Sequence, residues 1–73
     1  MITQKQFKEM CRKHDLTYSR SDDFRYWQKG FKSYQAIVEA ANELGHDVAA
    51  KIWNEVVDET MSEESRKDWH WDV

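Results

Sequence analysis

The sequence predicts an all-α protein, a small bundle of three to four helices built around one long central helix. Apolar residues recur at intervals of three and four along most of the 73 residues, which is the period of helices that bury one face. Residues that favour helix ends stand before each of these stretches. The chain contains no Pro and only two Gly, so it lacks the turn residues on which hairpin-rich β proteins depend.

The first predicted helix spans residues 3–14. Thr3 and Gln6 have the spacing of a capping box, in which each side chain bonds the backbone N–H of the other residue. One face of the helix carries Phe7, Met10, Cys11 and His14. The stretch 15–20 is expected to be a connection to the second helix.

The central helix is predicted over residues 22–44, with Ser21 as its N-cap. A line of apolar residues with heptad-like spacing runs along it, formed by Phe24, Trp27, Phe31, Tyr34, Val38 and Ala41. We expect this line to pack in the core. Gly30 stands inside the helix and indicates either a kink or the close approach of another segment.

A third helix is predicted over residues 48–60 and a short fourth helix over residues 63–69. Gly45 suits the end of the central helix, and Asp47 can cap the third. The apolar stripe of the third helix comprises Val48, Ile52, Trp53, Val56 and Val57. The C-terminal tail is expected to be either docked on the core or free. No linker or repeat separates these elements, so residues 1–73 are expected to form a single helical domain.

The formal net charge of −3 conceals two halves of opposite sign. Eight Lys or Arg against four acids give residues 1–32 a net charge of +4, whereas three against ten give residues 33–73 a net charge of −7. Halves of opposite charge predict either that they pack against each other or that they face different partners.

Composition also narrows the cellular setting and the chemistry. No apolar run is long enough to cross a membrane, and no membrane partner is expected. A single cysteine, Cys11, suits a reducing cytoplasm. Cys11 and His14 stand three residues apart, but a zinc site needs more ligands, and a catalytic pair needs a pocket. We therefore expect no enzyme, no catalytic residues, no metal and no cofactor.

Ten aromatic residues are more than a bundle of this size buries easily, since it hides only about 60% of its unfolded surface. Three rings have no predicted core position, and Tyr and Trp are common in protein interfaces. Five acids of the second half could add a negative surface beside them. The predicted protein-binding residues are Tyr26, Trp69, Trp71, Glu55, Asp58, Glu59, Glu63 and Glu64.

Residues 21–30 (SDDFRYWQKG) and 49–55 (AAKIWNE) resemble small, acidic, helical accessory proteins of tailed phages and prophages. The anti-CRISPR proteins are the best-known kind. The resemblance implies stoichiometric binding to a host enzyme or defence complex in the bacterial cytoplasm, by occlusion or by imitation of phosphate charge. It assigns no role to any single residue.

Two other functions remain open. A helix-turn-helix-like nucleic-acid regulator would use residues 34–58 or the basic first half, although the acidic third helix disfavours contact with phosphates. A self-assembling structural protein would pair residues 24–41 across a two-fold axis as a homodimer. The leading hypothesis is the non-enzymatic, protein-binding inhibitor of phage type.

Overall fold

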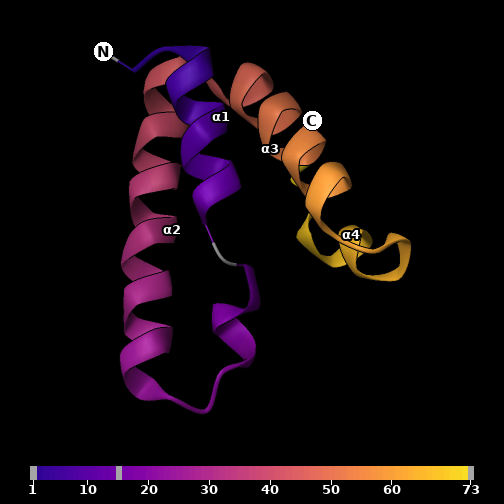
Figure 1. Ribbon diagram of the computed structural model, residues 1–73. Coiled ribbons are helices and arrows are strands. Elements are labelled where there is room, and N and C mark those ends of the chain that lie inside the picture. The colour runs from indigo at the N-terminus through magenta and orange to yellow at the C-terminus, as the bar shows by residue number, and fades with distance from the viewer. Residues whose placement is uncertain (1, 15, 73) are drawn as a thin grey trace.

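The computed structural model describes residues 2–14 and 16–72, and these residues form an all-α bundle (Figure 1). The elements are α1 (Gln4–Lys13), a short 3-10 helix η1 (Leu16–Arg20), α2 (Phe24–Leu44), α3 (His46–Thr60) and α4 (Glu63–Trp69). The predicted all-α bundle with one long central helix is confirmed. The helices begin and end within two residues of the predicted boundaries.

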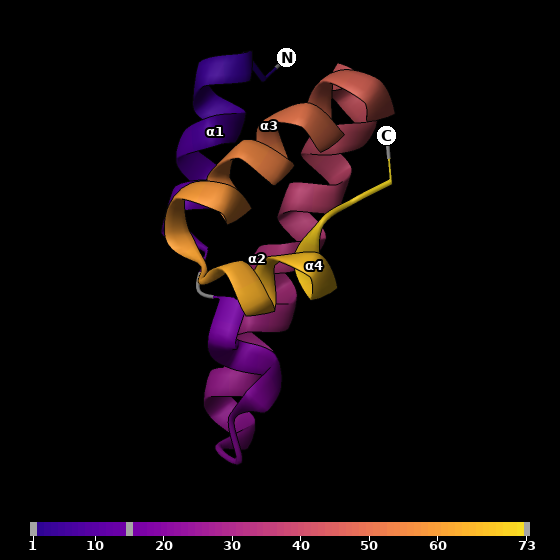
Figure 2. The same cartoon turned by 90° about the vertical axis from the view of Figure 1, so that its right-hand side faces the viewer.

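The helices cover the two halves of α2 unequally. Helices α1 and α3 pack along the C-terminal half of α2, while its N-terminal half extends beyond them and meets η1 (Figures 1 and 2). Helix α4 folds back under α3, and the tail returns along it. One half of the central helix therefore lies inside a bundle, and the other half has a single neighbour.

Capping side chains set where the helices begin. The capping box of Thr3 and Gln6 is confirmed, with both reciprocal hydrogen bonds present. The predicted cap of α2 is wrong by two residues, because the Oδ1 of Asp23 accepts from the N–H of Arg25 at 2.9 Å. Ser21 instead supports this turn by accepting from the N–H of Asp23.

A single residue joins the two longest helices. Gly45 ends α2 and begins α3, with φ at 95°, a conformation that favours glycine. Helix α3 therefore starts at His46, and Asp47 lies in its first turn rather than at its cap.

One continuous cluster forms the core. It comprises Phe7, Cys11, Ile37, Ala40, Ala41, Ala49, Ile52, Trp53, Val56 and Val57. Trp53 is its largest member and is fully buried, as predicted. The predicted apolar faces of α1 and α3 are confirmed, except that Val48 lies at the surface.

The apolar line predicted to bury α2 in the core is exposed at four of its six positions, and the prediction is wrong for these. Phe24 is 68% exposed, and Trp27, Phe31 and Val38 also lie at the surface. Of the line, Ala41 is buried and Tyr34 packs against the core, and the buried face of α2 also contains Ile37 and Ala40. A helix turns about 100° per residue, so the line through Phe31 and Val38 points about 100–120° away from Ile37.

Gly30 marks a close approach of η1, and α2 continues through it without interruption. A Cβ atom added at Gly30 would overlap the Cβ and Cγ atoms of Tyr18. Tyr18 is buried against this point of the helix. Glycine is therefore the residue that lets η1 cover the N-terminal half of α2.

We expect Gly30→Ala to lower the free energy of unfolding by about 1–3 kcal/mol, because the added methyl group overpacks the contact with Tyr18. Without that contact, alanine would stabilise the helix by about 1 kcal/mol relative to glycine. The sign of the change in unfolding free energy therefore tests the contact. Urea denaturation followed by circular dichroism measures the change. Gln28→Ala, at an exposed position of α2, is the matched control. Equal or greater stability of Gly30→Ala would contradict the contact.

Candidate protein-binding surface

Three stacked rings form the most exposed aromatic feature of the described chain. Phe24 and Trp27 lie with centroids 6.2 Å apart and ring planes at 16°, and Trp27 and Phe31 lie 5.3 Å apart at 7°. We call Phe24, Trp27 and Phe31 the aromatic ladder. Trp27 stacks on a ring from the turn before it and on one from the turn after it. The ladder is thus ordered by its own contacts while remaining open to a partner.

A shallow groove continues the ladder toward the C-terminal end of α2. Its volume is about 370 Å³, and its lining is formed by Phe31, Tyr34, Gln35, Val38 and Glu39. Val38 is 39% exposed, so the apolar surface runs from the ladder into this groove. Large contiguous apolar patches mark sites where proteins bind other molecules, so this surface is a candidate for such a site.

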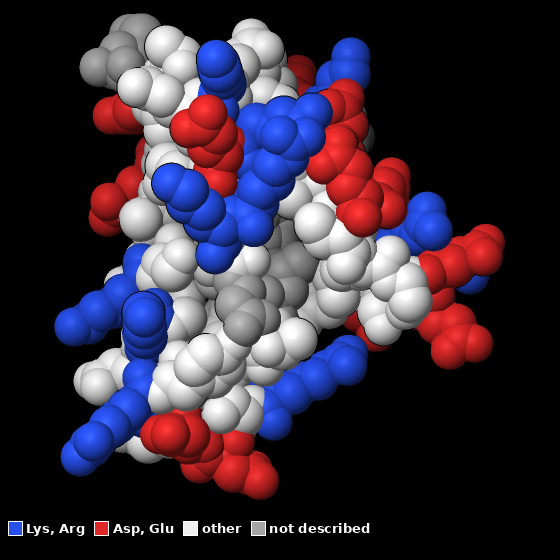
Figure 3. Space-filling view, in the orientation of Figure 1, with Lys and Arg blue, Asp and Glu red and all other residues white. Residues whose placement is uncertain are grey.

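Charges of opposite sign flank the two ends of this surface. Arg25, Lys29 and Lys32 are exposed on the N-terminal half of α2, while Glu39 and Glu43 are exposed on its C-terminal half. In Figure 3, blue side chains gather along the lower left edge of the molecule and red ones at the upper left, over the same helix. Helix α2 therefore carries a charge gradient along its length.

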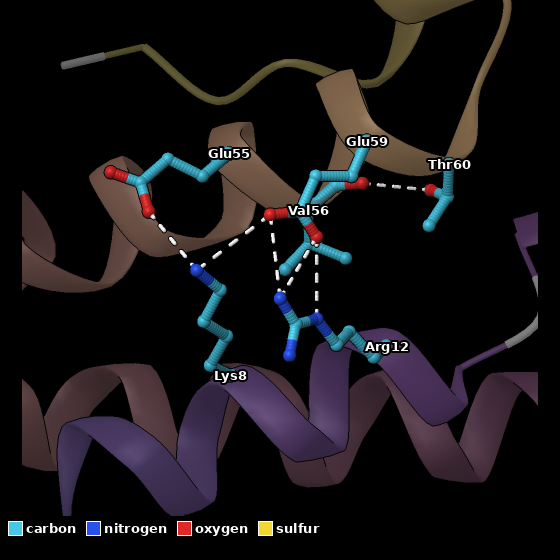
Figure 4. Close-up of polar contacts among 6 residues, drawn as sticks. All are labelled: Lys8, Arg12, Glu55, Val56, Glu59 and Thr60. Atoms are coloured by element: carbon cyan, nitrogen blue, oxygen red, sulfur yellow. Dashed lines mark hydrogen bonds and ion pairs between the residues drawn. The ribbon is translucent and has the colours of Figure 1, made fainter.

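The predicted acidic surface on α3 is partly occupied by the chain's own cations. Lys8 lies 3.5 Å from Glu55, and the guanidinium of Arg12 donates to both carboxylate oxygens of Glu59 (Figure 4). These side chains remain about half exposed, so each pair contributes only about 0–1 kcal/mol. The two oppositely charged halves of the chain meet here.

The remaining predicted acids divide into two kinds. Asp58 lies 2.7 Å from the Nε2 of His70 and 3.7 Å from Arg66, so its carboxylate is engaged within the molecule. Glu63 and Glu64 lie exposed in the first turn of α4. The structure therefore does not gather the five acids into one free surface.

Trp69 and Trp71, to which the sequence assigns no core position, are partly buried against the core, so the tail is docked. Trp71 stacks on Trp53 with centroids 4.8 Å apart, and its Nε1–H donates to the hydroxyl of Tyr34. The indole N–H of Trp53 donates to the carbonyl of Trp69 at 2.6 Å. The buried indole of Trp53 thus offers the tail both a ring face and a hydrogen-bond donor.

Asn54 fixes the tail from the neighbouring position on α3. Its side-chain amide donates to the carbonyl of Trp71 at 3.0 Å and accepts from the N–H of the same residue at 2.8 Å. Of the three rings singled out in the sequence, Tyr26 is also only partly exposed, with its hydroxyl 3.3 Å from the Oγ1 of Thr17.

Cys11 and His14 are both buried, and neither lies on the exposed surface. Desolvation raises the pKa of the Cys11 thiol from 9.0 to about 12, so it remains protonated at neutral pH. The Nδ1 of His14 lies 3.0 Å from the hydroxyl of Ser33. Within residues 2–14 and 16–72, no group of three or more His, Cys, Asp or Glu side chains could hold a metal ion.

The residues of the aromatic ladder are absent from the predicted protein-binding residues, although the homodimer alternative would pair residues 24–41. The ladder residues were assigned to the core because their spacing is that of a packed helix. A second apolar line, formed by Ile37, Ala40 and Leu44, runs along the same helix. Two apolar lines on one helix indicate that only one of them is needed to pack in the core, and that the other is exposed.

Comparison of the chain with models of protein families, with curated proteins and with solved structures gives no match. The resemblance to phage accessory proteins therefore stays a prediction. None of the helices in the described part of the chain is both long and apolar enough to span a membrane.

We expect Asn54→Ala to release the tail, because both of its hydrogen bonds to the Trp71 backbone are lost. The free energy of unfolding should fall by about 1–2 kcal/mol, and the amide of Trp71 should exchange its hydrogen faster. Asn42→Ala, at an exposed position of α2, is the control. Unchanged exchange at Trp71 in the Asn54 variant would show that the tail does not depend on this contact.

The buried thiol makes stability depend on pH in the alkaline range. Between about pH 9 and about pH 12 the unfolded chain loses the Cys11 proton while the folded chain keeps it, so the free energy of unfolding falls as pH rises. Below pH 9 this group has no effect. The stability advantage of wild type over Cys11→Ala should therefore shrink from pH 8 to pH 10.5 in urea titrations. A constant difference would contradict the raised pKa.

Proposed function

We propose that this chain is a non-enzymatic protein-binding module whose working surface is the aromatic ladder and the groove beside it. The observation that carries the proposal is the exposed, stacked arrangement of Phe24, Trp27 and Phe31 on α2. The form we favour is a phage-encoded inhibitor that covers a functional surface of a host or defence protein in the bacterial cytoplasm.

Pre-ordered rings are well suited to binding. Aromatic side chains account for many of the residues whose truncation weakens interfaces by about 2 kcal/mol or more. Because Trp27 is already held between two rings, docking immobilises few additional side-chain rotations. The buried face of α2 is supplied by other residues, so the ladder is not required to fill the core.

The surroundings of the ladder define the chemistry of the partner. The cations on the same side of the N-terminal half of α2, Arg25 and Lys32, favour an apolar cleft with acidic groups on its rim. Occlusion is favoured over charge mimicry, because Glu55, Asp58 and Glu59 are already paired within the chain. This moves the proposed contact from the acidic α3–α4 face to α2.

A nucleic-acid ligand is the second candidate, since exposed rings beside cations are typical of single-strand binders. Those proteins stack bases on free ring faces, however. In the ladder the faces of Trp27 are occupied by its neighbours at 6.2 and 5.3 Å. Binding of single-stranded DNA that weakens steeply with salt would favour this candidate instead.

We expect Trp27→Ala/Phe31→Ala to weaken capture of the partner from bacterial lysate by about tenfold or more, because two interface rings are truncated. Immobilised wild type and variants would be compared by quantitative mass spectrometry, with helicity checked by circular dichroism. Val48→Ala, an exposed apolar truncation on α3, is the matched control.

A second variant, Glu63→Gln/Glu64→Gln, tests the acidic surface separately. The proposal requires that proteins captured by wild type are also captured by this variant and by Val48→Ala, and are lost with the ladder variant. Full capture by the ladder variant, or loss only with the Glu63 and Glu64 variant, would contradict it.

A further inference from the structure

The ladder and the groove lie along one face of α2 and share Phe31. Phe24 and Trp27 stand at the N-terminal end of α2, and the groove beside Val38 lies toward its C-terminal end. A surface with a projection at one end and a hollow at the other fits a second copy of itself when the two helices run antiparallel.

We propose that in the free protein the aromatic ladder is covered by a second copy of this chain, in an antiparallel α2–α2 pair. The inference rests on the proposed function, because it states how the same binding surface is regulated. A partner must displace the second copy before it reaches the ladder.

The positions of the residues define the pair. If Phe24 of one copy lies over Val38 of the other, the two-fold axis passes at Phe31, which is midway between them in the sequence. The rings of Phe24 and Trp27 then enter the groove of the second copy. By symmetry, the same two rings of the second copy enter the groove of the first. Apolar rings in shallow grooves are the usual centre of such interfaces.

The charge gradient of α2 fits only the antiparallel direction. Arg25, Lys32 and Glu39 are spaced seven residues apart, and each follows a residue of the apolar line by one position. They therefore form one flank of α2, about 100° around the helix from the ladder. Across the two-fold axis each flank faces the same flank of the other copy, which brings Arg25 within about one turn of Glu39. A parallel two-fold pair would instead place this flank of the two copies on opposite sides of the contact, so that Arg25 and Glu39 would not meet.

These charges are available for such a contact. In the described part of the chain, neither Arg25 nor Glu39 takes part in an ion pair, and both are exposed. Lys32 lies close to the proposed axis, where it would face Lys32 of the second copy. Its charge therefore opposes the pairing that Arg25 and Glu39 favour.

The size of the contact predicts a weak pair. A helix of 21 residues is about 32 Å long and about 10 Å wide, so the paired face covers on the order of 300 Å² per copy. Stable interfaces bury about 800 Å² per partner. We therefore expect dissociation in the range of about 10 µM to about 1 mM, which a tighter partner can overcome.

The test is a charge exchange measured by sedimentation equilibrium over about 10 µM to about 1 mM protein. Arg25→Glu and Glu39→Arg should each raise the dimer dissociation constant by about tenfold, and the double variant should restore it to within about threefold. Lys32→Gln should tighten the pair by about threefold. Lys67→Glu, an exposed charge on α4, is the control and should leave the constant unchanged.

Three results would overturn the proposal. These are a monomeric mass across the whole range, unchanged or tighter association of Arg25→Glu, and no restoration in the double variant. All the substitutions replace exposed residues, and circular dichroism verifies that each variant remains folded.

Failure of this inference and failure of the proposed function are distinguishable. If the wild type is monomeric while Trp27→Ala/Phe31→Ala abolishes capture of another protein, the pairing is wrong and the proposed function stands. If charge exchange restores the dimer while the ladder variant captures the same proteins as wild type, the pairing stands and the proposed function is wrong.

Discussion

The burial of Trp53 is the interaction on which the rest of the structure depends. Its indole lies at the centre of the core, edge-on to Tyr34 at 5.7 Å and stacked on Trp71 at 4.8 Å. Its N–H holds the carbonyl of Trp69. One side chain therefore joins α2, α3 and the tail, and burying it contributes about 3 kcal/mol or more.

Packing against Trp53 determines which face of α2 is buried. The small and medium side chains of Ile37, Ala40 and Ala41 allow α2 to approach the bulky indole closely. The larger aromatic rings turn away, and the N-terminal half of the helix extends past α1 and α3 (Figure 1). Exposure of the ladder follows from where the core is placed and not from any polarity of its own residues.

Local sequence signals predicted the helices well because their causes are local. The capping box at Thr3, the glycine at position 45 and the three-and-four spacing of apolar residues act within one or two turns. The choice between two apolar lines on α2 is not local, because it depends on Trp53 of another helix. Docking of Trp71 depends on Asn54 in the same way. For this reason Phe24, Trp27 and Phe31 are exposed where the core was predicted, and Trp69 and Trp71 pack against the core.

The opposite charges of residues 1–32 and 33–73 are used in two ways. Part of this charge is satisfied inside the molecule, where Lys8 and Arg12 meet Glu55 and Glu59 (Figure 4). The part that remains runs along α2, whose exposed cations and acids lie at opposite ends (Figure 3). Although the net charge is only −3, the exposed face of α2 is positive at one end and negative at the other. This charge pattern favours one orientation of a partner that binds the ladder.

The central claim is that the aromatic ladder is the surface through which this chain binds a protein. Photo-crosslinking in bacterial cells tests it most directly, with a photoreactive amino acid placed at Trp27 in one variant and at Glu64 in another. Both side chains are exposed, so the comparison separates α2 from α4. The account predicts covalent adducts from position 27 and none from position 64. Adducts from position 64 alone would contradict it.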